Sequence, residues 1–332
     1  VQTCALPISI FETFASLEWR LGERFQVNPS IGAQVPLVDI QPTLEPRLRL
    51  AYVFSSHQNH EVSLATGRYV QLSYGFSDTR DVGSVFTVLT PYTHNSQRQS
   101  SLHGILGYQG HYFDRVDVSL EGYVKRHQNM LVSEWTPNVG GTLETAQADG
   151  LSYGVDTRIE YQGPNMSVAA GYGWSKVRYE AASGDLGAWI QNPVFEYAPA
   201  HDRRHKVNLS ARYRLQNYRA SIQWSYGSGR PYTRVSAFDL SLDVPDEAPL
   251  QDAGTGKTFF SRPYGARLPS YHRLDLSVGR TVDLSEGTTL DVKAGVLNAY
   301  NRENIFYLNQ ETLRAVDQIQ LTPYVSMKIS FQ

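Results

Sequence analysis

The chain is built from segments in which apolar and polar residues alternate one by one, and its last stretch shows this most cleanly. Val325, Met327, Ile329 and Phe331 fall on one side of this stretch, with polar or charged residues between them. Because successive side chains of a β-strand point to opposite faces, the pattern predicts a two-sided strand that ends at Phe331. Such a strand needs a partner strand and an apolar environment for one face.

The same alternation recurs along the chain, and the segments come in pairs. Residues 206–215 and residues 218–226 both alternate, and only Gln216 and Asn217 separate them. A two-residue break between two alternating runs predicts a β-hairpin. The whole chain contains about 13 such segments, each of roughly the length that crosses a bilayer when the strand is tilted.

The connections between these segments are sorted by length. Short links alternate with mostly long ones. The short links are residues 21–24, 55–59, 110–115, 163–165, 216–217 and 284–287. The long ones are residues 77–100, 133–149, 180–203, 229–272 and 302–316, with a shorter one, residues 34–43, at the start. Tight turns at one end and long loops at the other are typical of outer-membrane barrels, whereas a Greek-key sandwich has no reason to sort its loops. We therefore predict an all-β fold, an antiparallel up-and-down transmembrane β-barrel that is incomplete, with about 13 strands.

The composition agrees with this fold and excludes other classes. The chain carries 30 Lys and Arg against 32 Asp and Glu, so its bulk charge does not favour nucleic acid. Its one cysteine, Cys4, excludes an internal disulfide and a zinc-thiolate cage. Aromatic residues are frequent, at 12%, and many fall near segment ends, where interfacial girdles of barrels lie.

The two sides of the predicted strands have different expected environments. Charged residues of both signs recur on the polar sides and predict a polar lumen with cross-strand pairs; these are Asp117, Glu121, Lys125, Asp156, Arg158, Glu160, Arg212 and Arg214. On the last strand, the apolar side is expected to face lipid, through Val325, Met327, Ile329 and Phe331.

A crowded charged run lies where a long loop re-enters a strand. We expect residues 201–205 to form a charged barrel rim, and the candidate ligand contacts there are His201, Asp202, Arg203, His205 and Arg230. Metal binding or acid-base catalysis would require a spaced set of ligands that the sequence lacks. No catalytic residue, metal site or cofactor is therefore expected.

Two further patterns are interpreted as ordinary loops. Residues 254–258 (GTGKT) end like a phosphate-binding loop, but Gln251 stands where the motif requires glycine. A group of acidic residues in the same long connection has the composition of a solvated loop; it comprises Asp239, Asp243, Asp246, Glu247 and Asp252.

Several ordered motifs carry a resemblance to a known family. Residues 202–209 (DRRHKVNL) followed by 226–233 (YGSGRPYT), then 268–276 (LPSYHRLDL) and 296–304 (VLNAYNREN), resemble the late barrel strands of TonB-dependent outer-membrane receptors. The resemblance implies a barrel of about 22 strands plugged by an N-terminal domain. It also implies extracellular loops that capture a scarce ligand such as a siderophore, cobalamin, glycan or peptide, and active transport driven through TonB.

The resemblance covers most of residues 10–332, which we expect to be the C-terminal portion of such a barrel, with the plug domain absent. Residues 1–9 fit no strand pattern, look like a translated sequencing adaptor, and are expected to be non-native. The implied location is the bacterial outer membrane. The implied partners are membrane lipid, the barrel-assembly machinery, the TonB complex through the missing plug, and an unidentified small extracellular ligand.

Two alternatives remain open from the sequence. A passive porin or fatty-acid-type channel would have the same alternating strands in a complete barrel. A soluble all-β protein that binds or hydrolyses glycans would place the polar side of each strand in water, since alternation alone does not distinguish lipid from a protein core.

Overall fold

The computed structural model describes residues 9–37, 41–55, 60–76, 88–92, 97–133, 145–182, 194–241, 255–309, 312 and 314–331. Within these residues the chain forms β-strands and turns, and no helix is long and apolar enough to cross a membrane. Residues 1–8, most of the segment expected to be non-native, lie outside the described part, as do Asp243, Asp246, Glu247 and Asp252.

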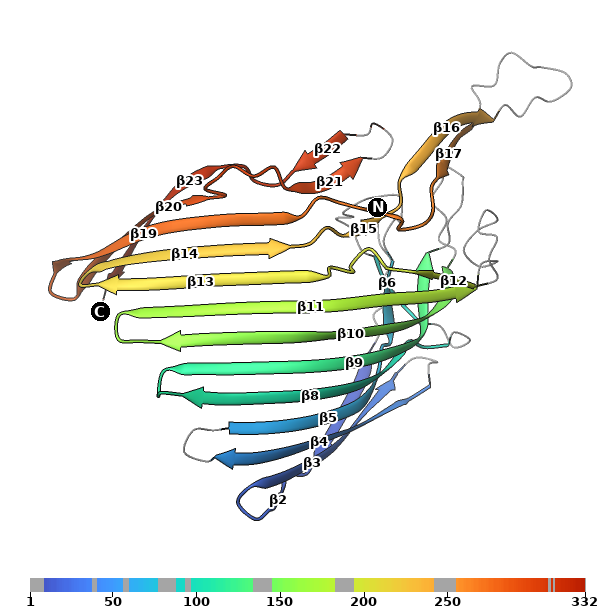
Figure 1. Ribbon diagram of the computed structural model, residues 1–332, viewed down its shortest axis with the longest axis horizontal. Helices are drawn as coiled ribbons and strands as arrows, with labels where there is room; N and C mark the ends of the chain where they lie inside the picture. The colour runs from blue at the N-terminus through green and yellow to red at the C-terminus, as the bar shows by residue number, and fades with distance from the viewer. Residues whose placement is uncertain are drawn as a thin grey trace, which may run out of the picture.

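One large antiparallel sheet dominates the molecule (Figure 1). Its strands lie side by side in chain order, which confirms the predicted up-and-down arrangement; they are β1 (Ile10–Ser16), β3 (Phe25–Pro36), β4 (Thr43–Ser55), β5 (His60–Val70), β8 (Ser100–Tyr112), β9 (Val116–Ser133), β10 (Thr145–Gln162), β11 (Met166–Ala182), β13 (His205–Leu215), β14 (Tyr218–Gly227), β19 (Tyr271–Ser285), β20 (Thr288–Leu297) and β23 (Thr322–Phe331). Two short strands join its margins: β2 (Trp19–Leu21) pairs with β3, and β12 (Val194–Tyr197) pairs with β11.

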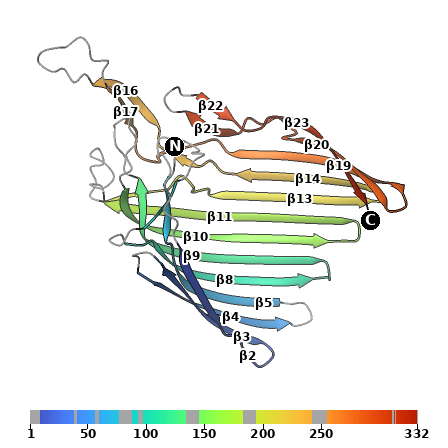
Figure 2. The same cartoon turned by 180° about the vertical axis from the view of Figure 1, so that it is seen from behind.

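The short turns lie at one end of this sheet and the long connections at the other, as Figure 2 also shows from behind. The long connections are not plain loops, however, and this corrects the sequence interpretation. They carry small two-stranded sheets: β6 (Ser73–Phe76) with β7 (Val88–Pro91), β15 (Pro231–Tyr232) with β18 (Ala266–Arg267), β16 (Val235–Ser241) with β17 (Thr255–Phe260), and β21 (Ile305–Asn309) with β22 (Arg314–Asp317). These strands lack clean alternation, which explains why the pattern missed them.

The central strands are longer than a bilayer requires. β9 and β10 have 18 residues each and β11 has 17, whereas a tilted transmembrane strand needs about 9–11. The surplus extends past the neighbouring strands at the end with the long connections (Figure 1). The small strands of the long connections gather at that end.

Large apolar side chains on one face of the sheet are exposed. On β4, Ala51 and Glu45 are buried, at 2% and 5% exposed, whereas Leu44 on the other face is 57% exposed. On β19, Ser277 is 9% exposed and Val278 is 56% exposed. One face of the sheet is therefore apolar and open, unlike the apolar face of a water-soluble sheet, which packs into a core. This is the arrangement expected of a sheet whose outer face meets hydrocarbon.

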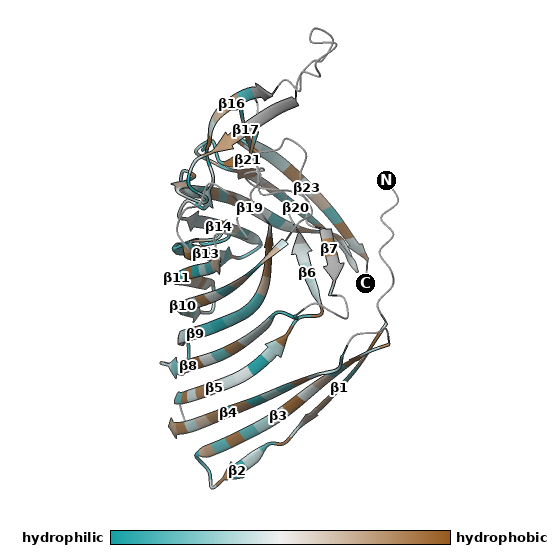
Figure 3. Ribbon diagram, turned by 90° about the vertical axis from the view of Figure 1, so that its right-hand side faces the viewer, coloured by the Kyte–Doolittle hydropathy of each residue, from teal (hydrophilic) through white to brown (hydrophobic). Residues whose placement is uncertain are grey.

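The sheet curves strongly, and β1 and β23 form the two margins of the resulting trough (Figure 3). No pairing between β1 and β23 occurs within the described residues, so the barrel is not closed.

Candidate functional site: the polar face and the mouth above it

Cross-strand register gathers the predicted interior charges on one face of the sheet. Glu121 pairs with Asp156, which pairs with Gly173, which pairs in turn with Lys206. Residues in register share a face, and residues two apart in a strand also share it. The polar face defined in this way contains Asp117, Glu121, Lys125, Asp156, Arg158, Glu160, Arg212 and Arg214. That this face lines a lumen stays a prediction.

Some charges on the polar face are balanced by a near neighbour. Arg158 pairs with Glu160 on the same strand, and Arg273 Nη2 lies 2.6 Å from Asp275 Oδ2 two positions along β19. Such pairs form because residues i and i+2 of a strand project from the same face. Pairs between strands also occur, as between His111 and Asp117, at 2.7 Å. The polar face thus combines cross-strand pairs with pairs inside single strands.

The opposite, apolar face carries the side chains expected to meet lipid. On β23 the exposed fractions are 67% for Val325, 69% for Met327, 53% for Ile329 and 79% for Phe331. Their assignment to lipid stays a prediction. Leu209 and Tyr213 on β13 share this face, at 42% and 47% exposed.

Asp202 forms a buried clamp at the long-connection end of the sheet. Its side chain is fully buried, and its Oδ2 accepts hydrogen bonds from Arg204 Nε at 2.9 Å and Arg267 Nη2 at 2.6 Å. Its Oδ1 accepts one from the backbone N–H of Val177 at 3.0 Å. Arg267 also donates to the backbone oxygen of Gly229, at 2.9 Å. The Asp202 carboxylate therefore joins β11, the entry to β13 and β18, and Arg267 extends this link to the segment after β14.

Next to this clamp, Arg203 and Arg230 bring two cations together. The guanidinium of Arg203 lies over Gly227 on the polar face, so close that a Cβ on Gly227 would stand 2.6 Å from Nη1, and it faces the Tyr271 ring at 5.9 Å. Burial and then the nearby Arg230 lower the pKa of Arg203. Neither arginine forms an ion pair within the described residues. Two adjacent cations without a carboxylate attract an anion.

The remaining rim candidates lie elsewhere. His205 is in register with Trp174 on the apolar face, where its Nδ1 lies 3.0 Å from the Tyr172 hydroxyl. His201 contacts Tyr179, with ring centroids 5.7 Å apart. The structure thus brings Asp202, Arg203 and Arg230 together and separates them from His205. The role of all five as ligand contacts stays a prediction.

Sequence reasoning missed an aromatic cluster at the long-connection end of the sheet, which we call the mouth. Tyr197 of β12 stacks on Tyr264, with ring centroids 5.2 Å apart and planes at 9°, and Phe195 stacks on Tyr197 at 5.7 Å. Met130 and Ala148 belong to the same buried cluster. Burial raises the pKa of both Tyr197 and Tyr264. These residues, like Arg267, lie in or beside connections without alternation, so no local pattern points to them.

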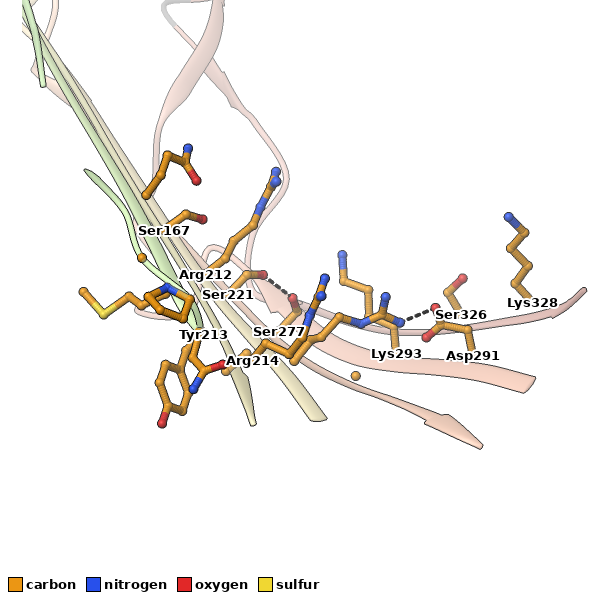
Figure 4. A pocket seen from close by; sticks show the side chains of 18 residues that line it. Ser167, Arg212, Tyr213, Arg214, Ser221, Ser277, Asp291, Lys293, Ser326 and Lys328 are labelled. Atoms are coloured by element: carbon orange, nitrogen blue, oxygen red, sulfur yellow. Dashed lines mark hydrogen bonds and ion pairs between the residues drawn. The ribbon is translucent and has the colours of Figure 1, made fainter. Parts of the chain in front are cut away.

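A second polar region lies at the short-turn end of the sheet, as a hollow of about 590 Å³ lined by the turn between β10 and β11 and by residues from β11 to β23 (Figure 4). Among the described residues, no three His, Cys, Asp or Glu side chains are grouped in a way that would hold a metal ion.

Comparison with family models matches residues 11–299 to the β-barrel of TonB dependent receptor-like proteins. The chain belongs to this family. Members of the TonB-dependent receptor family are transport receptors of the bacterial outer membrane, so the family assignment does not support the porin and soluble glycan-binding alternatives. No sequence among curated proteins matches the chain.

Solved structures share the fold. The ferric-catecholate import receptor Fiu from K12 E. coli, in its closed form, superposes with a TM-score of 0.64 at 13% identity. The ferric enterobactin receptor PfeA of Pseudomonas aeruginosa gives 0.61 at 12%, and the ferric yersiniabactin uptake receptor FyuA of Yersinia pestis gives 0.59 at 12%. Each match covers 97% of this chain but only 44%, 44% and 45% of the respective receptor. The chain therefore spans less than half the length of these receptors.

Proposed function

We propose that this chain is the C-terminal part of the barrel of an outer-membrane receptor that imports a scarce ligand by TonB-dependent active transport. The observation that carries the proposal is the open apolar face of the sheet, with exposed large side chains opposite the face that carries the charged residues, in a chain of the TonB-dependent receptor family. The proposal extends to the domain arrangement: residues 10–332 belong to the barrel, residues 1–9 are not native, and a plug domain belongs to the same receptor.

The ligand class we propose is a ferric siderophore or another anionic metal complex. The names of three structural relatives specify ferric siderophores. In this chain, Arg203 and Arg230 supply two adjacent cations beside Tyr271 at the mouth. Guanidinium groups suit the planar oxygen-rich edges of such complexes, and partial burial strengthens their attraction for an anion. Membrane lipid, the barrel-assembly machinery and TonB are the remaining proposed partners.

Uptake measurements test this function. The intact receptor is expressed in cells that lack their own siderophore receptors, and import of radiolabelled iron complexes is followed with and without TonB. We expect import of at least one complex that stops when TonB is deleted or when an uncoupler collapses the proton gradient. Import that continues under both conditions would establish passive permeation instead.

In the same assay, Arg203→Ala should weaken import. Arg158→Ala should not, because Arg158 is on the polar face but is paired with Glu160.

A further inference from the structure

Three cations gather on the apolar face of the main sheet, toward the mouth. Arg126 of β9 is in register with Leu151 of β10, which is 41% exposed and is in register with Arg178 of β11. Lys176 lies two residues before Arg178 in β11 and therefore on the same face. β9 and β11 are the two neighbours of β10 (Figure 1). The three cations thus surround Leu151 within a width of about 10 Å.

The level of these cations along the strands matches the edge of a lipid-facing band. Arg126 lies ten residues after Val116, where β9 begins, and Lys176 lies ten residues after Met166, where β11 begins. Both strands begin at the short-turn end. At about 3.3 Å per residue and a tilt of about 40°, ten residues rise about 25 Å, which is the height of the apolar band of outer-membrane barrels. The cations therefore stand at the level of the lipid headgroups.

Two of the three cations have no carboxylate partner within the part of the chain that the structure describes. Arg178 Nη1 lies 3.1 Å from Glu196 Oε1, whereas Arg126 and Lys176 form no ion pair there. Both unpaired cations project from the face that carries exposed leucine and valine side chains. Unpaired cations at the edge of an apolar surface attract the anionic headgroups of lipids.

Two carboxylates stand one step beyond the cations, on the side away from the bilayer. Asp149 and Glu180 are in register with each other and lie on the same face, two residues from Leu151 and from Arg178 respectively. The Oδ1 atom of Asp149 accepts a hydrogen bond from the backbone N–H of Asn129, at 3.2 Å. An anion that arrives from water meets these carboxylates first, whereas one that belongs to a lipid arrives from the other side. The arrangement favours a lipid over a soluble anion.

On the bilayer side of the cations, the layer of apolar side chains has a gap. Gly122 lies four residues before Arg126 on the same face, and no atom stands within 4 Å of the position that a Cβ there would take. Its partners in register, Leu106 and Val155, are 58% and 39% exposed. An acyl chain that lies over Gly122 would contact both side chains while its headgroup reaches Arg126.

We propose that Arg126, Lys176 and Arg178 bind the phosphorylated headgroup of a membrane lipid whose acyl chain lies over Gly122. Guanidinium forks and an ammonium group suit the oxygens of phosphate. The site lies on the outer wall of the sheet and is distinct from the mouth and from the polar face. The inference rests on the proposed membrane location of the barrel and does not depend on the transported ligand.

Native mass spectrometry of the intact receptor in a mild detergent tests the proposal. The receptor is titrated with phosphatidic acid, or with phosphatidylcholine that has the same acyl chains but no net charge. We expect phosphatidic acid to bind saturably and more tightly than phosphatidylcholine. Arg126→Gln and Lys176→Gln should each weaken the binding of phosphatidic acid about fivefold, as expected when one cation beside an anionic lipid is lost.

Two further variants separate charge from shape. Lys125→Gln is the matched control, because Lys125 adjoins Arg126 in β9 but lies on the polar face, and it should bind phosphatidic acid as the native receptor does. Gly122→Leu fills the gap while it leaves every charge in place, and it should also weaken the binding of phosphatidic acid.

Equal binding of the two lipids, or equal weakening in Lys125→Gln, would overturn the site. Unchanged binding in Gly122→Leu would overturn the placement of the acyl chain. Equally tight binding of glycerol 3-phosphate, which has no acyl chains, would overturn the assignment to a lipid. Heat-modifiable migration on gels is measured on the same samples. A receptor that assembles as a barrel but binds both lipids equally leaves the proposed function standing, whereas a receptor that does not assemble overturns both.

Discussion

Arg267 Nη2 donates to Asp202 Oδ2 across 2.6 Å, although the two residues are 65 positions apart in the chain. Asp202 ends the long connection before β13, and Arg267 belongs to β18, inside the long connection before β19. The pair therefore joins two connections that the main sheet does not itself hold together. Because Arg203 directly follows Asp202, the same pair sets where the cations of the mouth lie.

Asp202→Asn should loosen the mouth without unfolding the barrel. The substitution leaves Arg204 and Arg267, both partly exposed, without a carboxylate, and we expect a loss of about 1–3 kcal/mol in the free energy of local opening. Limited proteolysis of the assembled protein measures this as faster cleavage between β12 and β13. Asp117→Asn, at an exposed carboxylate, is the control and should leave the cleavage rate unchanged.

Gly227→Ala should displace Arg203 while sparing the sheet. The added Cβ would stand 2.6 Å from the end of a flexible side chain, which moves aside more readily than backbone would. We expect ligand affinity to fall about tenfold, as one charged hydrogen bond is lost, and the thermal midpoint to change little. Gly122→Ala serves for comparison, since nothing lies within 4 Å of a Cβ there. Equal affinities in the two variants would rule out Arg203 as a ligand contact.

Leu209→Arg should lower the yield of membrane-assembled protein far more than Asn208→Arg. The two residues are neighbours on β13, but Leu209 lies on the apolar face and Asn208 on the polar face. Arginine facing hydrocarbon near the bilayer midplane costs about 2–4 kcal/mol. Quantifying heat-modifiable protein in outer-membrane fractions compares the two. Similar yields would show that the faces are assigned incorrectly.

The mouth should lose stability in alkali. Burial raises the pKa of Tyr197 and Tyr264 above 10.0 in the folded protein. The stability that these two neutral side chains give the folded mouth is therefore fully present below pH 10 and is lost as the pH rises above 10. In the unfolded mouth each tyrosine ionises near pH 10, which costs the folded form about 1.4 kcal/mol per pH unit for each residue. Hydrogen exchange of β12 between pH 9 and 11 should show the loss, and Tyr197→Phe should reduce its slope. Tyr213→Phe, at an exposed position, should leave the slope as it is.

The alternation predicted the sheet well because each strand separates two environments. Adjacent residues of a strand face different environments, so the pattern can be read from a short stretch of sequence. For example, the alternation over residues 206–215 predicted both faces of β13 and placed its bounds within one residue of those in the structure. The sequence could not predict the clamp, because Asp202 and Arg267 are far apart in the chain and only the tertiary structure brings them together. His205 was grouped with Arg203 because they are neighbours in sequence, whereas entry into β13 turns its side chain to the apolar face. The strands of the long connections lack alternation, so only the structure reveals them.

Single-cysteine labelling along β23 in intact outer membranes tests the central claim, that the apolar face meets lipid while the polar face encloses an aqueous interior. Cys4 is first replaced by serine, and cysteines are then placed one at a time from Val325 to Ile329. The account predicts that cysteines at Ser326 and Lys328 react with a water-soluble maleimide, and that those at Val325, Met327 and Ile329 react only with a lipid-soluble one. Uniform reaction with the water-soluble reagent along the strand would contradict it.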